Sequence, residues 1–173
     1  MKVLIAGAGI GGLTTALMLH ARGIPVQIYE TAAEVREAGV GINILPHAIR
    51  ELETLGLLPA LDVVGLRTRR LTYYTRSGQE VWSELRGTYA GHEVPQFSIH
   101  RGRLQHLLYK AVLDRLGPKA VQTGRRLGGF VQDDKGITAH FANSIDGSKG
   151  ITVRGDVLIC CDGIHSAGRK VFY

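Results

Sequence analysis

The sequence predicts an α/β fold in which a parallel sheet is accompanied by a small antiparallel β meander. A short apolar strand pattern at 2–8 is followed by helical spacing of apolar residues at 10–21 and a second strand pattern at 25–30. These segments make a βαβ unit with a right-handed crossover. A second helical pattern covers 101–116, and short alternating runs joined by tight turns follow it.

Composition sets the broad class of protein. The chain has 173 residues, 45% hydrophobic and 21% charged, which is typical of one globular domain with its own core. The net charge of +6 favours anionic ligands, phosphates among them. A strand pattern that starts at the second residue leaves no room for a signal peptide, and the apolar runs are too short to span a bilayer. We therefore expect a cytoplasmic location and no membrane partner.

Each element of the βαβ unit has a local reason. The segment "KVLIAGA" is apolar throughout and bounded by glycine, which is typical of a buried parallel strand. The next segment carries one apolar stripe from Ile10 to Ala21, and Gly23 with Pro25 ends the helix. "PVQIYE" then returns as the second strand.

The middle of the chain interrupts this alternation. The glycine-punctuated stretch 34–47 predicts an extended loop, and proline at the first position predicts a helix from Pro46 to about Leu55. Alternation on both sides of Ser77-Gly78 predicts a hairpin over 67–86. A helix should begin near Arg101.

The stretch "RTRRLTYYTR" at 67–76 mixes basic and aromatic residues, as nucleic-acid surfaces do. Its strand-like alternation, continued by "QEVWSEL", favours a hairpin with a solvated basic face instead. We therefore expect no nucleic-acid partner.

The last third should form the meander, with a turn at Asp134-Lys135-Gly136. The tripeptide Arg154-Gly155-Asp156 resembles an integrin-binding signal, but a turn between two strands explains it better. Cys160 and Cys161 are adjacent and would point to opposite faces of a strand, so we expect two buried free thiols.

The strongest chemical signal is "GAGIGG" at 7–12, which follows a strand and opens a helix. Gly7 permits the tight turn, Gly9 lets the backbone approach a pyrophosphate, and Gly12 lets helix and strand pack closely. Ile10 and Gly11 complete the motif at the helix N-terminus, where free N–H groups and the helix dipole favour phosphate.

Glu30 ends the second strand, where its carboxylate is placed to accept hydrogen bonds from ribose hydroxyls. The context predicts a Rossmann-like site for an adenine dinucleotide. FAD and NAD both satisfy it, and a glycine turn without a ligand is the structural alternative.

Four segments and one residue carry a family resemblance: "GAGIGGL" with Glu30, "GVGINILPHAI", "QFSIHRGRLQ" and "DVLICCDGIHSAGRK". Together they resemble the FAD-dependent aromatic hydroxylases, the flavoprotein monooxygenases of the 4-hydroxybenzoate hydroxylase type. Within that group they are most similar to phenazine hydroxylases that act on 5-methylphenazine-1-carboxylate. The resemblance implies that 1–173 is the FAD-binding domain, the N-terminal part of a longer fold, with 67–100 beginning a substrate-domain excursion.

The resemblance also implies FAD contacts outside the glycine motif and Glu30. Arg36 matches an arginine near the adenosine, Gly41 with Ile42 matches backbone that passes along the flavin, and Arg101 matches an arginine that reaches the cofactor from a helix start. Leu127 matches an apolar residue beside adenine.

The final motif matches the family's Asp-Gly fingerprint at Asp162-Gly163, followed by Ser166 and Arg169. In the family this segment lies near the FAD pyrophosphate and also serves the pyridine nucleotide. The chain departs from the family at Gly168, where a β-branched residue is usual, and it ends before a second, Gly-Asp fingerprint.

The activity that the resemblance implies is hydroxylation. NADH or NADPH reduces FAD, and the reduced flavin uses molecular oxygen to hydroxylate a small aromatic ring. The cofactor carries that chemistry, so we nominate no catalytic side chain. The histidines show no paired metal spacing, and only His47, after "GINILP", lies where the family places the flavin.

Two other functions stay open. One is an FAD- or NAD-binding module without monooxygenase activity, which would bind cofactor but consume no NADPH. The other is a pyridine-nucleotide dehydrogenase, which would carry no yellow flavin.

Overall fold

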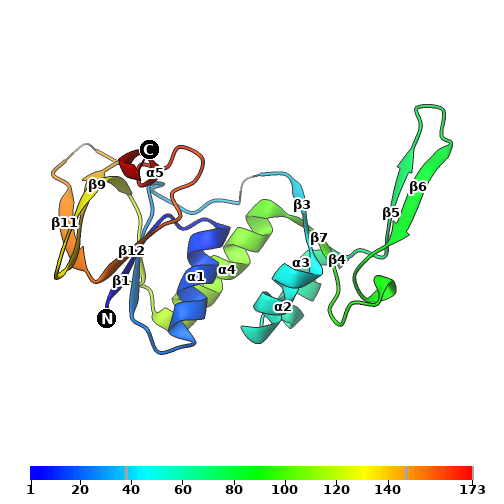
Figure 1. Ribbon diagram of the computed structural model, residues 1–173, viewed down its shortest axis with the longest axis horizontal. Helices are drawn as coiled ribbons and strands as arrows, with labels where there is room; N and C mark the ends of the chain where they lie inside the picture. The colour runs from blue at the N-terminus through cyan, green and yellow to red at the C-terminus, as the bar shows by residue number, and fades with distance from the viewer. Residues whose placement is uncertain (38, 147, 173) are drawn as a thin grey trace. The chain divides into compact units, whose positions relative to one another are not determined.

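The computed structural model describes residues 1–37, 39–146 and 148–172, and the chain divides into two compact units (Figure 1). The first unit consists of Met1–Arg36 and the chain from Gln105 onward. The second consists of Glu37–Leu104. The predicted α/β class is confirmed, with a parallel sheet and an antiparallel meander both in the first unit.

The parallel sheet of the first unit has four strands in the order β12-β1-β2-β8. Helix α1 (Ile10–His20) connects β1 to β2, as the βαβ prediction requires. Val3 of β1 pairs with Val26 on one side and with Val157 on the other, so the last strand of the chain lies beside the first. The strands are β1 (Val3–Ala6), β2 (Val26–Tyr29), β8 (Val121–Gln122) and β12 (Val157–Cys160).

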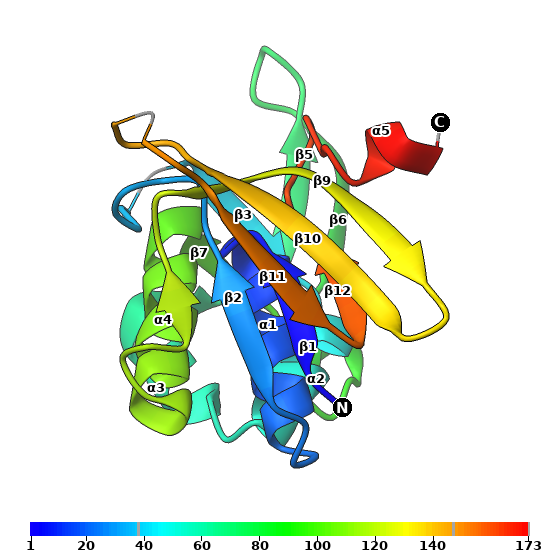
Figure 2. The same ribbon diagram turned by 90° about the vertical axis from the view of Figure 1, so that its left-hand side faces the viewer.

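The antiparallel meander covers one face of this sheet, and α1 lies behind the parallel strands (Figure 2). Its three strands pair in the order β11-β10-β9, as predicted. Leu4 and Tyr29 of the parallel sheet pack in one core cluster with Phe141 of the meander. The Tyr29 and Phe141 rings stack with centroids 4.1 Å apart. The strands are β9 (Arg125–Asp133), β10 (Gly136–Asn143) and β11 (Ile151–Gly155).

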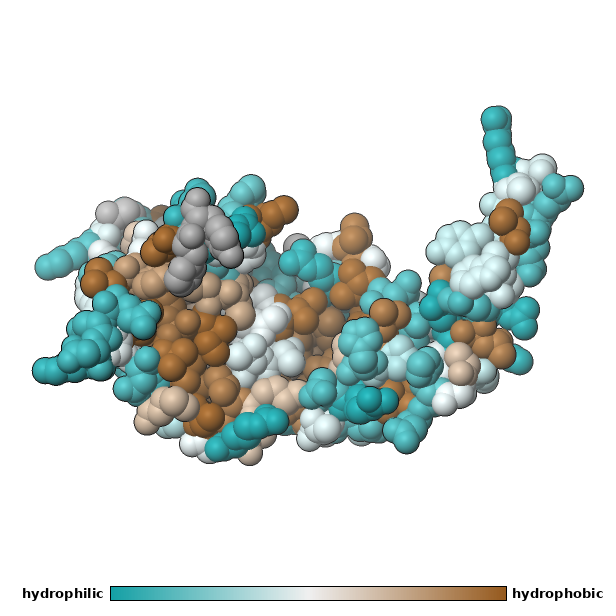
Figure 3. Space-filling view, viewed as in Figure 1, coloured by the Kyte–Doolittle hydropathy of each residue, from teal (hydrophilic) through white to brown (hydrophobic). Residues whose placement is uncertain are grey.

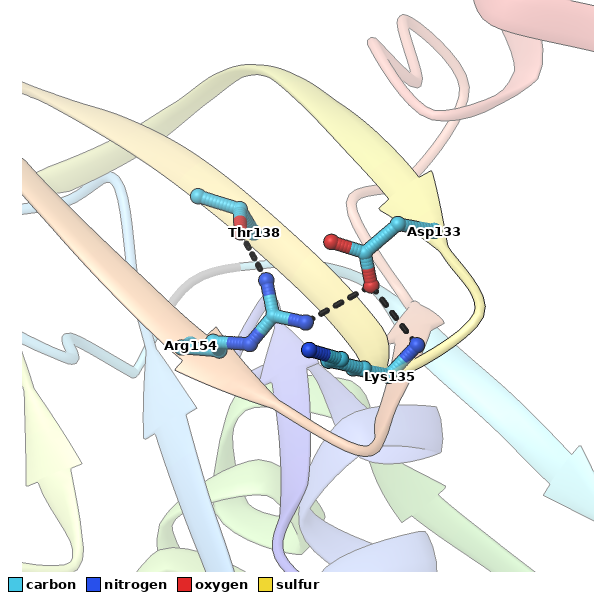
Figure 4. Close-up of polar contacts among 4 residues, drawn as sticks. All are labelled: Asp133, Lys135, Thr138 and Arg154. Atoms are coloured by element: carbon cyan, nitrogen blue, oxygen red, sulfur yellow. Dashed lines mark hydrogen bonds and ion pairs between the residues drawn. The ribbon is translucent and has the colours of Figure 1, made fainter.

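The Arg-Gly-Asp tripeptide lies at the predicted junction between two strands, but Arg154 and Gly155 are the last residues of β11, and Asp156 alone separates it from β12. Its arginine is already engaged: the Arg154 guanidinium donates to the Asp133 carboxylate at 2.6 Å and to the Thr138 hydroxyl at 3.0 Å (Figure 4). The Lys135 N–H donates to the same Asp133 oxygen at 2.9 Å. The Arg154 hydrogen bond and then that N–H hold the pKa of Asp133 below its ordinary value. These contacts join both outer strands of the meander.

Two more helices belong wholly or partly to the first unit. Helix α4 (Arg101–Leu116) begins in the second unit and continues into the first, close to the predicted bounds. Gly117, with φ of 91°, follows its last residue in the left-handed region that favours glycine. Helix α5 (Arg169–Phe172) is a single turn.

The second unit contains a sheet that the sequence analysis did not predict. Strands β3 (Gly41–Ile44), β7 (Phe97–His100) and β4 (Gly65–Arg67) form an antiparallel sheet in the order β3-β7-β4. The prediction of an extended loop over 34–47 was therefore wrong for its last part. Gly41 pairs with His100, and a partner so distant in sequence leaves no local periodicity to detect.

Helix α2 (Pro46–Thr54) confirms the helix predicted at Pro46, which occupies its first turn. Helix α3 (Leu58–Val64) was missed, because seven residues are too few to show a periodic apolar stripe.

The predicted hairpin is confirmed as β5 (Arg70–Tyr74) paired with β6 (Glu80–Leu85), and the 3₁₀ turn η1 (Gly87–Ala90) follows it. Figure 3 shows hydrophilic side chains at the hairpin tip. Two arginines of the basic stretch make contacts inside the unit. Arg67 donates to both carboxylate oxygens of Asp62 at 2.6 and 2.7 Å, and Arg69 lies over the Tyr89 ring at 5.2 Å.

The expectation of two buried cysteines was wrong. Cys160 is exposed and Cys161 is half-buried, since they lie at and just beyond the end of β12 rather than inside a covered strand. Both are free thiols. Across 1–37, 39–146 and 148–172, no helix has the length and apolar character needed to cross a membrane.

Candidate cofactor site

Two turns meet at one edge of the parallel sheet. Because β1 and β12 are adjacent and parallel, the turns that follow them leave the sheet at the same edge. The Cys161 N–H donates to the Ala6 carbonyl at 2.8 Å and continues the ladder past the end of β12. The Asp-Gly turn at Asp162-Gly163 therefore lies against the glycine-rich turn that follows β1.

Gly7 and Gly12 are required by packing. Gly7 has φ of 103°, and a Cβ there would overlap the Cys161 carbonyl and lie 3.2 Å from the Asp162 nitrogen. A Cβ on Gly12 would overlap the Gly7 carbonyl. A side chain at position 7 would push the two turns apart, and a side chain at position 12 would push the first helix away from the glycine turn.

Gly9 and Gly11 face open space. A Cβ at either position would have no heavy atom within 4 Å, and neither glycine has a positive φ. Gly9 is the N-cap of α1 and supplies no side-chain cap. The first helical hydrogen bond runs from the Leu13 N–H to the Gly9 carbonyl, so the N–H groups of Ile10, Gly11 and Gly12 have no partner among the described residues. Free N–H groups at a helix N-terminus that open onto space suit a phosphate.

Glu30 is tied to this turn. One carboxylate oxygen accepts the Ala8 N–H at 2.6 Å, and the other accepts the Ala32 N–H at 2.8 Å. The side chain therefore joins the glycine turn to the chain that leaves β2. It lies where the sequence analysis placed it, at the end of the strand next to β1.

The Asp162 carboxylate organises the second turn. One oxygen accepts the Ala167 N–H at 2.7 Å and the Gly168 N–H at 3.2 Å. The other oxygen is buried and has no hydrogen-bond partner in the described part of the chain. Desolvation raises the pKa of Asp162, but hydrogen bonds from the Ser166 hydroxyl and these N–H groups outweigh it, so the pKa lies below its ordinary value. A buried acceptor without a donor is costly, so this oxygen is suited to a hydroxyl or amide of a bound group.

The sequence analysis predicted no contact for Gln105, whereas the resemblance implied that Leu127 lies beside adenine. The Gln105 side-chain amide donates to the Ala8 carbonyl at 2.9 Å and so holds the glycine turn from α4. No motif signals such a contact.

The Leu127 side chain is only 5% exposed and belongs to the core cluster between sheet and meander. The side chain is therefore engaged in core packing and is not free to contact a cofactor.

Arg36 is exposed and pairs with Glu34, with Nε 3.0 Å from a carboxylate oxygen. The remaining predicted contacts lie in the second unit. Gly41 and Ile42 open β3, and the Arg101 N–H donates to the Val40 carbonyl at 3.0 Å. The exposed Arg101 guanidinium, at the start of α4, has no acidic partner among the described residues. The structure thus gathers the glycine motif, Glu30 and Asp162 in one unit, and Gly41, Ile42 and Arg101 in the other.

Within 1–37, 39–146 and 148–172, no three His, Cys, Asp or Glu side chains lie close enough together to hold a metal ion.

The sequence is similar to those of known proteins. A family model described as FAD binding domain matches residues 1–172. The phenazine 1,6-dicarboxylic acid hydroxylase PhzS of Lysobacter antibioticus is 47% identical over 168 residues, covering 96% of this chain and 41% of that protein. An FAD-dependent urate hydroxylase of Klebsiella pneumoniae is 31% identical over 183 residues, covering 98% of this chain and 42% of its own length. The chain spans about two fifths of the length of these relatives.

Solved structures show the same fold. The crystal structure of HpxO from Klebsiella pneumoniae, complexed with FAD and uric acid, superposes with a TM-score of 0.77 at 30% identity, covering 96% of this chain and 40% of that one. The rebeccamycin biosynthetic protein RebC superposes with a TM-score of 0.80 at 25% identity, covering 99% of this chain and 34% of that one.

Proposed function

The chain belongs to the FAD binding domain family, and on that premise we propose that it is the FAD-binding part of an NAD(P)H-dependent flavoprotein monooxygenase. The reaction would be the hydroxylation of a small aromatic substrate by molecular oxygen. Named relatives support this reading, since they include a phenazine hydroxylase and a urate hydroxylase. A cytoplasmic location is part of the same proposal.

One observation carries the cofactor assignment. At Gly7 and Gly12, neighbouring backbone atoms leave no room for a side chain. At Gly9 and Gly11 of the same turn, the space next to the backbone is open, and a ligand could approach there. The free N–H groups of Ile10 and its neighbours would receive the FAD pyrophosphate. Open space is common at surface glycines, but here it borders three N–H groups at the start of a helix that have no partner among the described residues.

The other predicted residues have separate parts in the proposal. Glu30 would accept a ribose hydroxyl while still holding the Ala8 N–H, because a carboxylate oxygen accepts more than one hydrogen bond. The partnerless oxygen of Asp162 would accept a donor from the cofactor or the pyridine nucleotide. Arg36 and Arg101 would neutralise phosphate or flavin charge, and the backbone of Gly41, Ile42 and Leu127 would line the cofactor.

FAD, when bound, supplies the redox chemistry with NAD(P)H and oxygen. The residues of this chain bind and orient the cofactor. No side chain is assigned to proton transfer. In this proposal 67–100 begins the part of the protein that covers the substrate, and it lies within the second unit.

The test is a titration of the purified protein with FAD, followed by flavin fluorescence and by the visible spectrum of the protein after gel filtration. We expect co-eluting flavin bands and saturable quenching of flavin fluorescence. Protein that elutes without flavin after incubation with excess FAD would refute the proposal. Flavin binding without consumption of NADPH, in the presence of phenazine carboxylates or phenols, would instead support a binding module without monooxygenase activity.

A further inference from the structure

The backbone of Ala8, in the glycine turn, is held by two side chains. Ala8 is buried, with 0% of its surface exposed. Its N–H donates to the Glu30 carboxylate at 2.6 Å, and its carbonyl accepts a hydrogen bond from the Gln105 side-chain amide at 2.9 Å. The Ala8 backbone makes no other hydrogen bond to the described residues. All three residues belong to the first unit, so this arrangement is complete within it.

The Ala8 carbonyl has an alternative partner that it does not use. In an α-helix a carbonyl accepts the N–H four residues later, which for Ala8 is the N–H of Gly12. The first such bond of α1 instead runs from the Leu13 N–H to the Gly9 carbonyl. A buried carbonyl without any donor is costly. The Gln105 amide therefore supplies the hydrogen bond that would otherwise favour one more residue of helix.

This contact also sets the direction of the next N–H group. The Ala8–Gly9 peptide is trans, so its carbonyl and its N–H point to opposite sides. With the carbonyl directed at Gln105 in α4, the Gly9 N–H points away from that helix. It has no hydrogen-bond partner among the described residues, like the N–H groups that follow it in the turn.

We propose that Gln105 is a positioning residue that keeps the N–H groups of Gly9 and Gly12 available to the FAD pyrophosphate. Without its amide, the Ala8 carbonyl would turn toward the Gly12 N–H. That rotation would occupy one donor and redirect the other. The identity of the ligand rests on the proposed function, whereas the contact between Gln105 and Ala8 exists without cofactor.

The first variant is Q105M, which removes the donor but nearly keeps the volume and the helix propensity of glutamine. Flavin fluorescence titration should show FAD affinity about tenfold lower, as expected when one hydrogen bond to a charged group is weakened. The second variant, Q105E, has the shape of glutamine. At about pH 8 its carboxylate is ionised and cannot donate, so it should lower FAD affinity at least as much.

NMR of the protein without FAD gives an independent measurement. The Ala8 carbonyl carbon and the Gly9 amide nitrogen belong to the peptide that Gln105 holds, so both resonances should move in Q105M. Inorganic pyrophosphate is the probe for the donors. It should shift the Gly9 and Gly12 N–H resonances of the wild type saturably, and Q105M should bind it about fivefold more weakly.

Q27M is the matched control. The Gln27 side-chain amide also donates to backbone carbonyls in the first unit, those of Lys119 and Ala120 at 2.8 and 3.0 Å, but it lies near the start of β2, away from the turn. Q27M can lower stability, as Q105M can, and urea unfolding measures both losses. It should leave the affinities for FAD and pyrophosphate unchanged.

Q105M protein that binds both probes as tightly as the wild type would overturn the inference. An equal loss of affinity in Q27M would also overturn it, because the effect would then follow from general loosening of the unit. Wild-type protein that shows the pyrophosphate response, and its loss in Q105M, but does not bind FAD would support the inference and refute the proposed function.

Discussion

The side chain of Cys160 occupies the space that a side chain at position 168 would need. A Cβ built on Gly168 would overlap the Cys160 sulfur and lie 2.8 Å from its Cβ. Gly168 is the position where this chain departs from the family's usual β-branched residue, and this packing explains why glycine stands there. Cys160 ends β12 and Gly168 precedes α5, so the contact packs the final turn of the chain against the parallel sheet.

The two positions should therefore be coupled energetically. We expect G168A to lower the free energy of unfolding by about 1–3 kcal/mol through overpacking. In the C160G background the same substitution should cost at least about 1 kcal/mol less, because the colliding atoms are gone. Urea unfolding of the four proteins in this cycle measures the coupling.

Gly11 is the matched control for that cycle, since a Cβ there has no heavy atom within 4 Å. G11A should not be destabilising, and it should have the same effect with Cys160 or with glycine at 160. Equal costs of G168A in the two backgrounds would contradict the coupling.

Substitutions in the glycine turn should separate ligand binding from folding. G9V places a side chain in open space, so the free energy of unfolding should change by less than about 1 kcal/mol while FAD affinity falls at least about tenfold. G12A should instead destabilise the protein by about 1–3 kcal/mol, because its Cβ overlaps the Gly7 carbonyl. Thermal unfolding and flavin fluorescence titration report the two effects.

G129V serves as the control for G9V, because Gly129 in β9 also has no heavy atom near its Cβ position and lies outside the turn. It should leave FAD affinity unchanged. A G9V protein that binds FAD as tightly as the wild type would show that the pyrophosphate does not approach at Gly9.

Asp162 should make stability depend on pH. Its pKa in the folded protein lies below the ordinary value, through hydrogen bonds from the Ser166 hydroxyl and backbone N–H groups that outweigh desolvation. A depressed pKa means that the charged carboxylate stabilises the fold above its ordinary pKa of about 3.9, and that this contribution is lost as the pH falls toward the folded value. D162N should be less stable than the wild type at pH 7, with a gap that narrows toward pH 3.

Urea midpoints at several pH values measure this gap, and an NMR titration of the carboxyl carbon checks the direction of the pKa shift. A gap that stays constant on acidification would show that the Asp162 hydrogen bonds act through shape rather than charge, and a gap that widens would contradict the depressed pKa.

Some helices and strands could be predicted from short stretches of sequence alone. The continuous apolar run before Gly7, the stripe from Ile10 to Ala21 and the proline at 46 predicted β1, α1 and the start of α2. The spacing of the three motif glycines also predicted that Gly12 packs closely and that the space beside Gly9 stays open. Periodicity, capping and turn chemistry act over a few residues, so they can be recognised without knowledge of the rest of the chain.

Tertiary structure decided which distant segments meet. The pairing of β12 with β1 places the Asp162 turn against Gly7, and the pairing of Gly41 with His100 makes a strand of what the sequence predicted as loop. Gln105 reaches the Ala8 carbonyl only because α4 packs beside a turn that is remote in sequence. Strand order and register depend on burying both faces of a sheet at once, a condition that no short window of sequence contains.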